Sequence, residues 1–528
     1  MNNTAPYLFG KLCEMRKEQK RQKQKYNYHT RDELIHMAQL INFEITSQTS
    51  NQDICEAVRE IAIQNNLNTY EEFENYVLNL ELLKYPSFDD FLMFQPGLHS
   101  INYYFNGINN INHFSQTVHR LGIASDNGFL HRLTYNNNGR TLPVILKSNI
   151  RPMNDNLYHE YVAGQCINEF SKYFPFFPRT YALGMYNNEN TWRMFNEHYG
   201  TFGLLSPLSN YLTYLNPLDQ EQNLRISCSG AKHINIYLQF INIKCNLRQY
   251  FNNLKLYGRP QINRLYQTRL TYNILMIYLV YKTLSKLGNY FTHYDLHNDN
   301  VVIYDIPEQK YIELEIKTDA GIIQLRTNCI PIMIDFGRSY FNCENLKTGT
   351  LSSPNLMRNV CNYDNRNPII ANRVCPYYCG DEKGYGFFGN LNPDGTIGPT
   401  DVNSYWINRG MGNISHDLRL ISDLKHNMSL SRLDMSISYI NQFNELLNSI
   451  HYRDYHEFGM PETRNTVPPM NPINNIHDVA NYLETIIFLP EFKTDLYHEL
   501  SLTNPNSYGT LYLDFSTNSI DKFRFVKH

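Results

Sequence analysis

The sequence lacks any apolar run long enough to cross a membrane. Its strongest run, Ile274 to Tyr281, is bounded by Asn273 and Lys282. It falls far short of the roughly 20 residues that a bilayer span needs. The opening of the chain, MNNTAPYLFGKLCEMRKEQKRQKQK, also lacks the apolar core of a secretory signal. We therefore expect a soluble, cytoplasmic protein whose cysteines are thiols.

The sequence also lacks a strong excess of either charge. Lys and Arg together number 47 and Asp and Glu number 50, which gives a formal net charge of -3. This balance argues against a coat for nucleic acid and against an acidic, solvated chain. Apolar residues make up 42% of the 528 residues, so the chain can bury a sizeable core. Its length predicts two or three folding units.

Tightly spaced cysteine pairs of the kind that bind zinc are missing as well. Cys343, Cys361, Cys375 and Cys379 form only a loose group. A structural zinc site would have closer paired spacing. We therefore interpret these four residues as free cysteines in a loop.

The order of the predicted elements changes along the chain. Short β-rich runs begin near residue 116, a long amphipathic helix follows from Leu265 to Leu287, and irregular and helical segments come after it. This order predicts an α+β fold. Its segments are a basic arm over 1–29 (disordered or a solvated helix), a small helical module over 30–70, connecting helices over 71–115, a small β-rich lobe over 116–243, and a mainly helical lobe over 244–528 with an insertion at 305–328.

Two capping boxes mark the helices of the small module. Thr30 pairs with Glu33 and Ser50 pairs with Asp53, each ahead of apolar residues at helical spacing. Two short helices joined by an extended segment, 43–45, resemble a SAP-like module, which would dock nucleic acid or a partner. The alternative is a scaffold hairpin that packs on the neighbouring domain, and we favour this interpretation.

Two short motifs carry the chemistry. The first is His293-Tyr294-Asp295-Leu296-His297-Asn298-Asp299-Asn300, and the second is Asp335-Phe336-Gly337. The first motif resembles the catalytic loop H-x-D-L-x-x-x-N of the protein-kinase-like superfamily, and the second resembles its D-F-G metal motif. The two motifs occur in the family's order after a long helix, and the resemblance covers roughly residues 116 to 450.

The resemblance implies a bilobal fold and ATP-dependent transfer of a phosphoryl group. Asp295 would lie near the incoming hydroxyl, and His293 would support the backbone of its loop. Asn300 and Asp335 would bind Mg²⁺, because this ion prefers oxygen ligands. Lys147, at the end of a predicted strand, would contact the α and β phosphates of ATP.

The ammonium group of Lys147 needs an anionic partner, because a buried unpaired charge is costly. Glu160 and Glu169 both lie on a helix predicted over 157–173. They are nine residues apart (169 − 160), or about two and a half turns, so they point in different directions. Glu160 is closer to the spacing usual in the family, and we predict that it pairs with Lys147.

The segment Leu121 to Leu130 resembles the family's glycine-rich loop. Gly122 and Gly128 would let backbone N–H groups approach the phosphates. Ala124 stands where a second glycine is usual, and Asp126 would place a negative charge close to the phosphates. This departure weakens the expectation of tight ATP binding.

A further segment, Gln239 to Asn242, resembles the hinge between the two lobes. It follows an apolar, β-rich run, and the backbone at Gln239 and Ile241 would bind the edge of the adenine. The alternative interpretation is an ordinary strand end.

Other features depart from the protein-kinase pattern. His297 replaces the lysine that is usual two residues after the catalytic Asp, and D-L-H resembles small-molecule kinases such as aminoglycoside and choline kinase relatives. Its imidazole would contact the transferred phosphate, or it is structural. The span from Asn300 to Asp335 is 35 residues (335 − 300), longer than usual. We predict that Tyr311–Ile316 and Gly321–Arg326 pair as strands in the insertion.

The region after the second motif also differs, because no A-P-E motif closes it. Residues 339–412 are long and polar, so no surface that would grip a peptide can be placed. By resemblance, Asp417 would anchor the backbone of the catalytic loop. The alternative is a solvated aspartate at a helix N-terminus, which is also common.

Three hypotheses about function follow. The first is an ATP- and Mg²⁺-dependent Ser/Thr-type protein kinase, and the second is a kinase-fold phosphotransferase acting on a small molecule. The third is an inactive scaffold or virion protein, because a fold does not guarantee its function. The composition and the long insertions resemble kinase-like proteins of large DNA viruses, which would place the protein in infected-cell cytoplasm or in the virion.

Overall fold

The structure, a computed structural model, divides into two compact units, Met1–Phe91 and Leu92–His528. It describes residues 7–13, 29–41, 43, 49–85, 87–122, 128–137, 139–150, 157–252, 261–307, 310–345, 349–356, 412–427, 434–450, 473–503, 505–517 and 521–528. The observations below concern each unit by itself.

In the part of the chain that the structure describes, the first unit contains three helices, a short hairpin and the start of a further helix, α5 (Phe88–Met93). Its elements are β1 (Tyr7–Leu8), β2 (Lys11–Leu12), α2 (Arg31–Leu40), α3 (Asn51–Gln64) and α4 (Tyr70–Leu82). Both predicted capping boxes are confirmed: Thr30 and Glu33 exchange backbone-to-side-chain hydrogen bonds, and Ser50 and Asp53 do the same. Each box satisfies backbone N–H groups that a helix start leaves unpaired.

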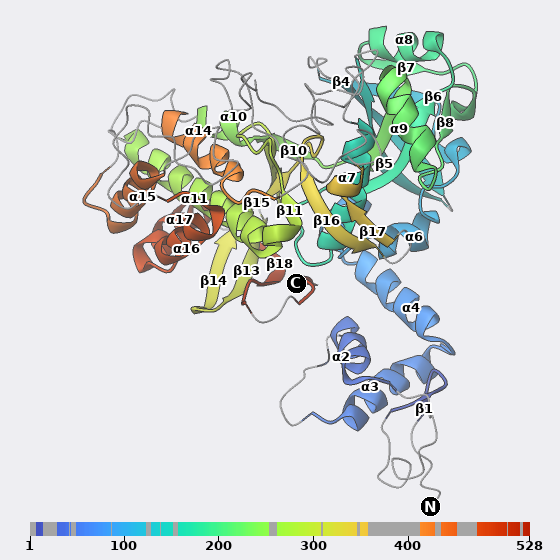
Figure 1. Cartoon of the computed structure of the whole chain (residues 1–528). Helices are drawn as coiled ribbons and strands as arrows, with labels where there is room; N and C mark the ends of the chain where they lie inside the picture. Colours follow the sequence, from blue (N-terminus) through green and yellow to red (C-terminus); the bar gives the residue numbers. More distant parts are fainter. Residues whose placement is uncertain are drawn as a thin grey trace, which may run out of the picture. The chain divides into compact units, whose positions relative to one another are not determined.

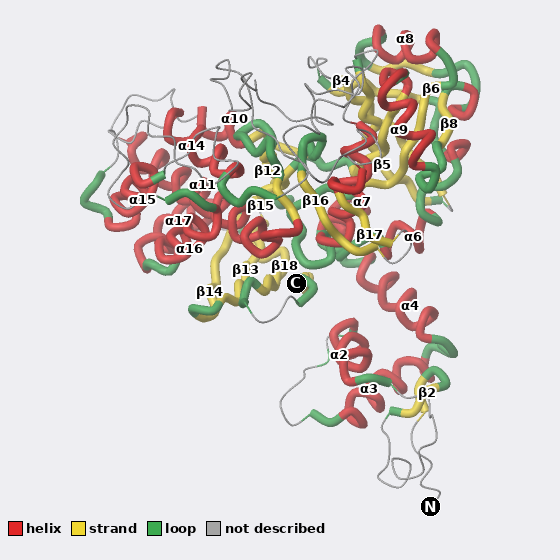
Figure 2. The backbone as a smooth tube through the Cα atoms, viewed as in Figure 1, coloured by secondary structure: helices red, strands yellow, loops and turns green. Residues whose placement is uncertain are grey.

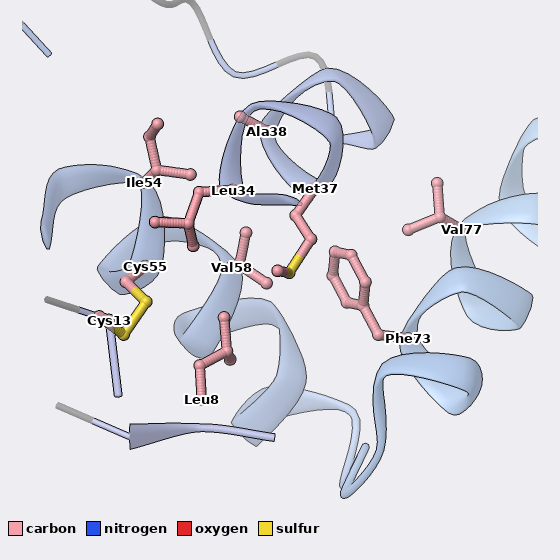
Figure 3. Packing of buried hydrophobic residues seen from close by; sticks show 10 residues of the cluster. All are labelled: Leu8, Cys13, Leu34, Met37, Ala38, Ile54, Cys55, Val58, Phe73 and Val77. Carbon is pink, nitrogen blue, oxygen red and sulfur yellow. A yellow bond between two sulfur atoms is a disulfide. The ribbon is translucent and has the colours of Figure 1, made fainter. Parts of the chain in front are cut away.

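The hairpin of the first unit contributes to the hydrophobic core. Leu8 and Cys13 pack with the apolar faces of α2, α3 and α4, as Figure 3 shows. Leu8, Leu12 and Cys13 are buried, so this part of the segment 1–29 is not a solvated basic arm. The basic run 16–25 lies outside the described residues, as does most of the segment 43–45.

Two disulfides contradict the expectation that the cysteines are thiols. Cys13 bonds to Cys55 in the first unit, and Cys166 bonds to Cys343 in the second. The partners are 42 and 177 residues apart, so linear spacing gave no indication of either pair. The other three cysteines of the loose group lie outside the described residues. Among residues that the structure does describe, no cluster of His, Cys, Asp or Glu could hold a metal ion.

The second unit contains a seven-stranded antiparallel sheet of strand order β7-β3-β4-β5-β9-β6-β8. Among these strands, Figure 1 labels β4 to β8. Along the central strand β5, apolar side chains such as Val144 and Leu146 are buried, in alternation with Ile145 and Lys147. The helix α7 packs against β6, β9 and a later strand, β16. The strands are β3 (Thr117–Leu121), β4 (Gly128–Asn137), β5 (Arg140–Asn149), β6 (Thr180–Tyr186), β7 (Thr201–Gly203), β8 (Leu212–Tyr214) and β9 (Ile234–Gln239).

Along the chain, helices precede the strands of this sheet and alternate with them. They are α5 (Phe88–Met93), α6 (His99–Phe105), η1 (Ile111–His113), α7 (Leu157–Phe170), α8 (Glu189–Glu197), η2 (Leu208–Asn210), α9 (Gln220–Ser229) and η3 (Ala231–His233). The β-rich runs that begin near residue 116 form strands such as β4 and β5, and α7 confirms the helix predicted over 157–173. The apolar, β-rich run before the hinge candidate forms β9, and a separate strand, β10 (Ile243–Asn246), follows the hinge candidate.

The rest of the second unit contains one long helix, α11 (Gln261–Leu287). It confirms the helix predicted from Leu265 to Leu287. It packs against α16 and α17, which in turn contact α15 (Figure 2). None of the helices in the described ranges combines the length and the apolar character that crossing a bilayer requires. The helices are α10 (Leu247–Asn252), α11, η4 (Gly288–Tyr290), η6 (His416–Leu418), α14 (Arg419–Asn427), α15 (Ser438–Ser449), α16 (Ile476–Ile487) and α17 (Pro490–Thr503).

Two three-stranded sheets are built from β10, which precedes α11 in the chain, and from strands that follow this helix. The first has the order β10-β12-β15, from β10 (Ile243–Asn246), β12 (Val301–Asp305) and β15 (Cys329–Met333). The second has the order β11-β16-β17, from β11 (Phe291–Thr292), β16 (Tyr340–Asn345) and β17 (Gly349–Ser352). In the first sheet, Val301 at the start of β12 lies opposite Met333 at the end of β15. The end of the first motif, Asn300, is therefore close to the start of the second motif, Asp335.

The predicted hairpin in the insertion is confirmed. The strands β13 (Lys310–Thr318) and β14 (Gly321–Thr327) pair antiparallel. The sequence did not indicate that β13 also pairs in parallel with β18 (Asn506–Asp514). The strand β18 in turn pairs antiparallel with β19 (Arg524–Lys527). The insertion is therefore part of a four-stranded sheet of order β14-β13-β18-β19.

A buried arginine ties the start of the second unit to the sheet. The Arg179 guanidinium donates to Gly97 O at 2.6 Å, to Gln239 Oε1 at 3.0 Å and to Gln95 O. We expect Arg179→Met to lower the free energy of unfolding by about 2–3 kcal/mol, because it leaves these buried acceptors unpaired. Urea unfolding would measure the change. Arg193→Met, at an exposed ion pair with Glu189, is the matched control and should change little.

Candidate active site

A cavity of about 910 Å³ in the second unit contains the residues that the sequence singled out. Its lining includes Gly122, Gly128, Lys147, Glu160, Gln239, Ile241, Asp295, His297, Asn300 and Asp335. These residues come from the seven-stranded sheet, from α7 and from the segments around β12 and β15. The fold thus brings residues from separate parts of the chain to one concave site.

Lys147 lies at the centre of an ion-pair cluster. Its Nζ is 2.7 Å from Glu160 Oε2 and 2.9 Å from Asp335 Oδ1. The alternation of β5 directs Lys147 to the cavity, and Glu160 lies in the first turn of α7. Burial by itself would lower the pKa of Lys147, but the carboxylates of Asp335 and Glu160 outweigh it and raise that pKa. The lysine is therefore held as a cation.

Glu169, the alternative partner, does not contact this cluster. It forms an ion pair with Lys172, three residues along the chain. Its position two and a half turns beyond Glu160 explains the difference, because the two side chains leave α7 in different directions. The disulfide from Cys166 to Cys343 joins the same helix to β16.

A buried carboxylate holds the loop that carries Asp295. Asp417 Oδ2 accepts the backbone N–H of His293 at 2.8 Å, and Oδ1 accepts that of Tyr294 at 3.0 Å. Burial raises the pKa of Asp417 to about 6, although His293 and these N–H groups oppose the rise. Of the two interpretations of Asp417, the anchoring one matches these contacts, since the residue is 1% exposed.

Two residues of the motifs have left-handed backbones. Tyr294 has φ +59° and Asp335 has φ +69°, conformations that L-residues rarely adopt. The bonds from Asp417 to the backbone and from His293 Nε2 to Ile334 O, at 3.0 Å, help to hold this geometry. Strain of this kind gathers at functional sites, where the surrounding contacts can maintain it.

Asn300 and Asp335 are brought together by the strand pair β12–β15. The Ile334 N–H donates to Asn300 O at 3.0 Å. Asp335 directly follows Ile334, so this backbone hydrogen bond holds the two ligand candidates near each other. Asn300 Nδ2 donates to Asp295 O at 2.9 Å. The amide oxygen of Asn300 therefore points away from that carbonyl group. Lys147, despite the opposing effect of burial, lowers the pKa of Asp335 to about 2. A carboxylate and an amide oxygen fit a Mg²⁺ ion that keeps several waters.

His297 lies between two acidic side chains of its own loop. Its Nε2 is 3.9 Å from Asp295 Oδ1 and its Nδ1 is 3.7 Å from Asp299 Oδ2. Nδ1 also accepts the Asp299 N–H at 3.2 Å, which assigns the proton of the neutral ring to Nε2. Burial lowers the pKa of His297, against the effect of Asp295. The ring is thus suited to donate a hydrogen bond at neutral pH rather than to carry a charge.

The two glycines at the cavity have different roles in the backbone. Gly122 has φ +63°, which favours glycine, and a Cβ at Gly128 would lie 2.5 Å from Ser148 O. The intervening residues 123–127, with Ala124 and Asp126, lie outside the described residues.

The hinge candidate forms another wall of the cavity. Gln239 donates its backbone N–H to Arg179 O at 2.8 Å, so this group is committed within the sheet. Phe240, Ile241 and Asn242 follow it along the cavity wall and lead into β10. Ile241 thus remains as the candidate for a backbone contact with a flat ring.

Two arginines near Asp295 were missed from the sequence. Arg419 Nη1 donates to Asp295 Oδ1 at 2.8 Å, and Arg338 Nη1 is 3.3 Å from the same oxygen. Both line the cavity. Arg338 directly follows the motif Asp335-Phe336-Gly337. This position was the one sequence signal that could have predicted Arg338 at the site.

Similarity to known proteins is found among solved structures. No family model matches the sequence, and no curated protein is similar to it. Among solved structures, the BubR1 kinase domain is similar at 12% identity and a TM-score of 0.33, covering 73% of this chain and 83% of that one. The kinase domain of PF14_0431 is similar at 14% identity and a TM-score of 0.21, covering 50% of this chain and 62% of that one. Both TM-scores are below 0.5.

Proposed function

We propose that this protein is an ATP- and Mg²⁺-dependent phosphotransferase with a protein-kinase-like fold. One observation carries the proposal: Lys147 Nζ contacts both Glu160 and Asp335 inside the cavity that also holds Asp295 and Asn300. A lysine held by two carboxylates, beside oxygen ligands for a hard cation, suits a nucleotide triphosphate.

Each residue has a role in this proposal. The hydroxyl oxygen of the acceptor attacks the γ-phosphorus of ATP, and the bond from that phosphorus to the bridging oxygen breaks, with its electron pair remaining on ADP. The hydroxyl proton passes to Asp295. Lys147 binds the α and β phosphates, while Gly122, Gly128, Gln239 and Ile241 line the nucleotide end. Mg²⁺, held by Asn300 and Asp335, would neutralise phosphate charge.

The acceptor that we favour is a Ser or Thr hydroxyl of a protein. A small-molecule acceptor is the second candidate, favoured by His297, which stands where protein kinases have lysine, and by the missing A-P-E motif. A catalytically inactive scaffold, including a virion component, is the third, favoured by Ala124 and Asp126 in the glycine-rich segment. The joint presence of Lys147, Asp295, Asn300 and Asp335 counts against it.

A thermal-shift titration with Mg-ATP tests the nucleotide site. A ligand that binds only the folded state stabilises it by RT ln(1 + [L]/Kd), about 2.7 kcal/mol at a hundredfold excess over Kd. We expect a rise in Tm for the wild type and at least a tenfold weaker Kd for Asp335→Asn, because the carboxylate ligand is lost. Unchanged affinity in calorimetry would refute the metal assignment.

A matched control separates this effect from a general loss of charge. Asp305→Asn removes a carboxylate at the far end of β12, where it pairs with Lys244 outside the cavity. This variant should keep the Mg-ATP shift of the wild type. If the wild type shows no shift at millimolar Mg-ATP, the inactive scaffold becomes the better explanation.

A further inference from the structure

The contacts of Asp295 are concentrated on one of its two carboxylate oxygens. Arg419 Nη1 at 2.8 Å, Arg338 Nη1 at 3.3 Å and His297 Nε2 at 3.9 Å all approach Oδ1. Within the described ranges, no hydrogen bond to Oδ2 is found. The arginines therefore fix the orientation of the carboxylate through Oδ1, and Oδ2 is the oxygen that can accept the proton of an acceptor hydroxyl.

The two arginines reach this point from separate elements. Arg419 begins α14, directly after the segment that holds the catalytic loop through Asp417, and Arg338 follows Gly337. Their side chains are 14% and 20% exposed, and both line the cavity. They are thus restrained groups at the wall of the site and not surface arginines.

A guanidinium group can hold Asp295 and a second oxygen at once. It has five N–H donors in a planar fork and stays charged at any ordinary pH. A hydroxyl within hydrogen-bond reach of Oδ2, about 3 Å away, places the phosphorus that it attacks beside the same two arginines. The negative charge on the transferring group is spread over its oxygens, and fixed positive charge at that point is an effective way to lower the barrier.

We propose that Arg338 and Arg419 are catalytic residues that contact the phosphoryl group during its transfer and neutralise the charge on its oxygens, while holding Asp295 through Oδ1. This inference rests on the proposed function and adds a step-specific role. In the reaction above, the arginines donate hydrogen bonds to the oxygens of the phosphoryl group as the bond to ADP breaks. They take up no proton, which goes to Asp295 Oδ2.

Hydrolysis of Mg-ATP tests this role without knowledge of the acceptor, because water replaces the hydroxyl. The products are ADP, phosphate and a proton. We expect Arg419→Gln and Arg338→Gln each to lower the hydrolysis rate by about 100-fold or more. Their Kd for Mg-ATP should change less than about threefold, since Lys147 and the metal site remain. Arg419→Lys should recover part of the rate, because it keeps the charge without the fork.

A second measurement does not depend on the hydrolysis rate. Fluoroaluminate added to Mg-ADP mimics a phosphoryl group in transfer, and we expect it to raise the wild-type Tm above that with Mg-ADP alone. This extra rise should disappear in Arg338→Gln and Arg419→Gln, while the rise with Mg-ADP remains. Arg326→Gln is the matched control, since Arg326 lies on β14 outside the cavity, and it should behave like the wild type.

The outcomes separate this proposal from the proposed function. If both glutamine variants keep the wild-type hydrolysis rate and the fluoroaluminate shift, the proposal is overturned and the arginines act on an anionic acceptor or on the fold. If Mg-ATP binds to the wild type but neither hydrolysis nor a fluoroaluminate shift occurs, the proposal is also wrong. If Mg-ATP does not bind at all, the proposed function itself fails. Should Arg419→Gln not fold, Arg338→Gln and Arg419→Lys give the same test.

Discussion

Replacing Lys147 with methionine should lower the turnover number by about a hundredfold to a thousandfold, because the charge that orients the phosphates is lost. The fold should survive, since methionine fills much the same space on β5. Stability should nevertheless fall by about 2–4 kcal/mol, because the buried charge of Glu160, whose side chain is 5% exposed, then loses the Lys147 ammonium group. Steady-state kinetics and urea unfolding would measure the two effects.

A double variant separates the two consequences. The double variant Lys147→Met with Glu160→Gln also removes the buried carboxylate charge of Glu160. Most of the lost stability should therefore return. Activity should not return, because no cation contacts the phosphates. If the single variant keeps wild-type turnover, a different residue binds the phosphates and our assignment of Lys147 is wrong.

Replacing Asp417 with asparagine should lower the turnover number by about a hundredfold, although Asp417 lies outside the reacting groups. Its two oxygens accept the backbone N–H groups of His293 and Tyr294, and asparagine can accept only one of them. One N–H would then face an amide NH₂ in a buried site. We expect the free energy of unfolding to fall by about 2–3 kcal/mol and the loop around Asp295 to shift.

The measurement compares kinetics with Mg-ATP binding for this variant. Since we propose that Lys147, Asn300 and Asp335 hold the nucleotide, Kd should change far less than the turnover number. Asp423→Asn, on α14, is a matched substitution on the helix that follows Asp417 in the chain, and it should leave turnover near that of the wild type. Equal losses in the Asp417 and Asp423 variants would contradict the anchoring role.

The elements around the site were largely predictable from the sequence, because their signals are local. Short β-rich runs indicated the positions of β4 and β5, the capping boxes gave the starts of α2 and α3, and the 3.6-residue pattern gave α11. The charged insertion alternated clearly enough to predict the hairpin of β13 and β14. Short motifs singled out Asp295, Asn300 and Asp335, which all line one cavity in the structure.

Other features depend on contacts between distant parts of the chain. Nothing in the sequence around Arg419 indicates that it meets Arg338 at one oxygen, since surface arginines have the same local pattern. The choice between the two interpretations of Asp417 likewise required its depth in the fold. The disulfide from Cys166 to Cys343 joins elements that only the folded chain brings together.

The parallel pairing of β13 with β18 sets an order for folding. Lys310 lies opposite Asn506, which is 196 residues later in the chain (506 − 310). At a synthesis rate of about 5–20 residues per second, β13 would wait roughly 10–40 s on the ribosome for its partner. Its apolar side chains, Ile312, Leu314 and Ile316, are buried in the folded protein and would meanwhile lack that strand. The seven-stranded sheet, complete by Gln239, has no such delay. The sheet that branches off between Asn300 and Asp335 is therefore among the last parts of the molecule to form, and the nascent chain is most prone to mispairing there.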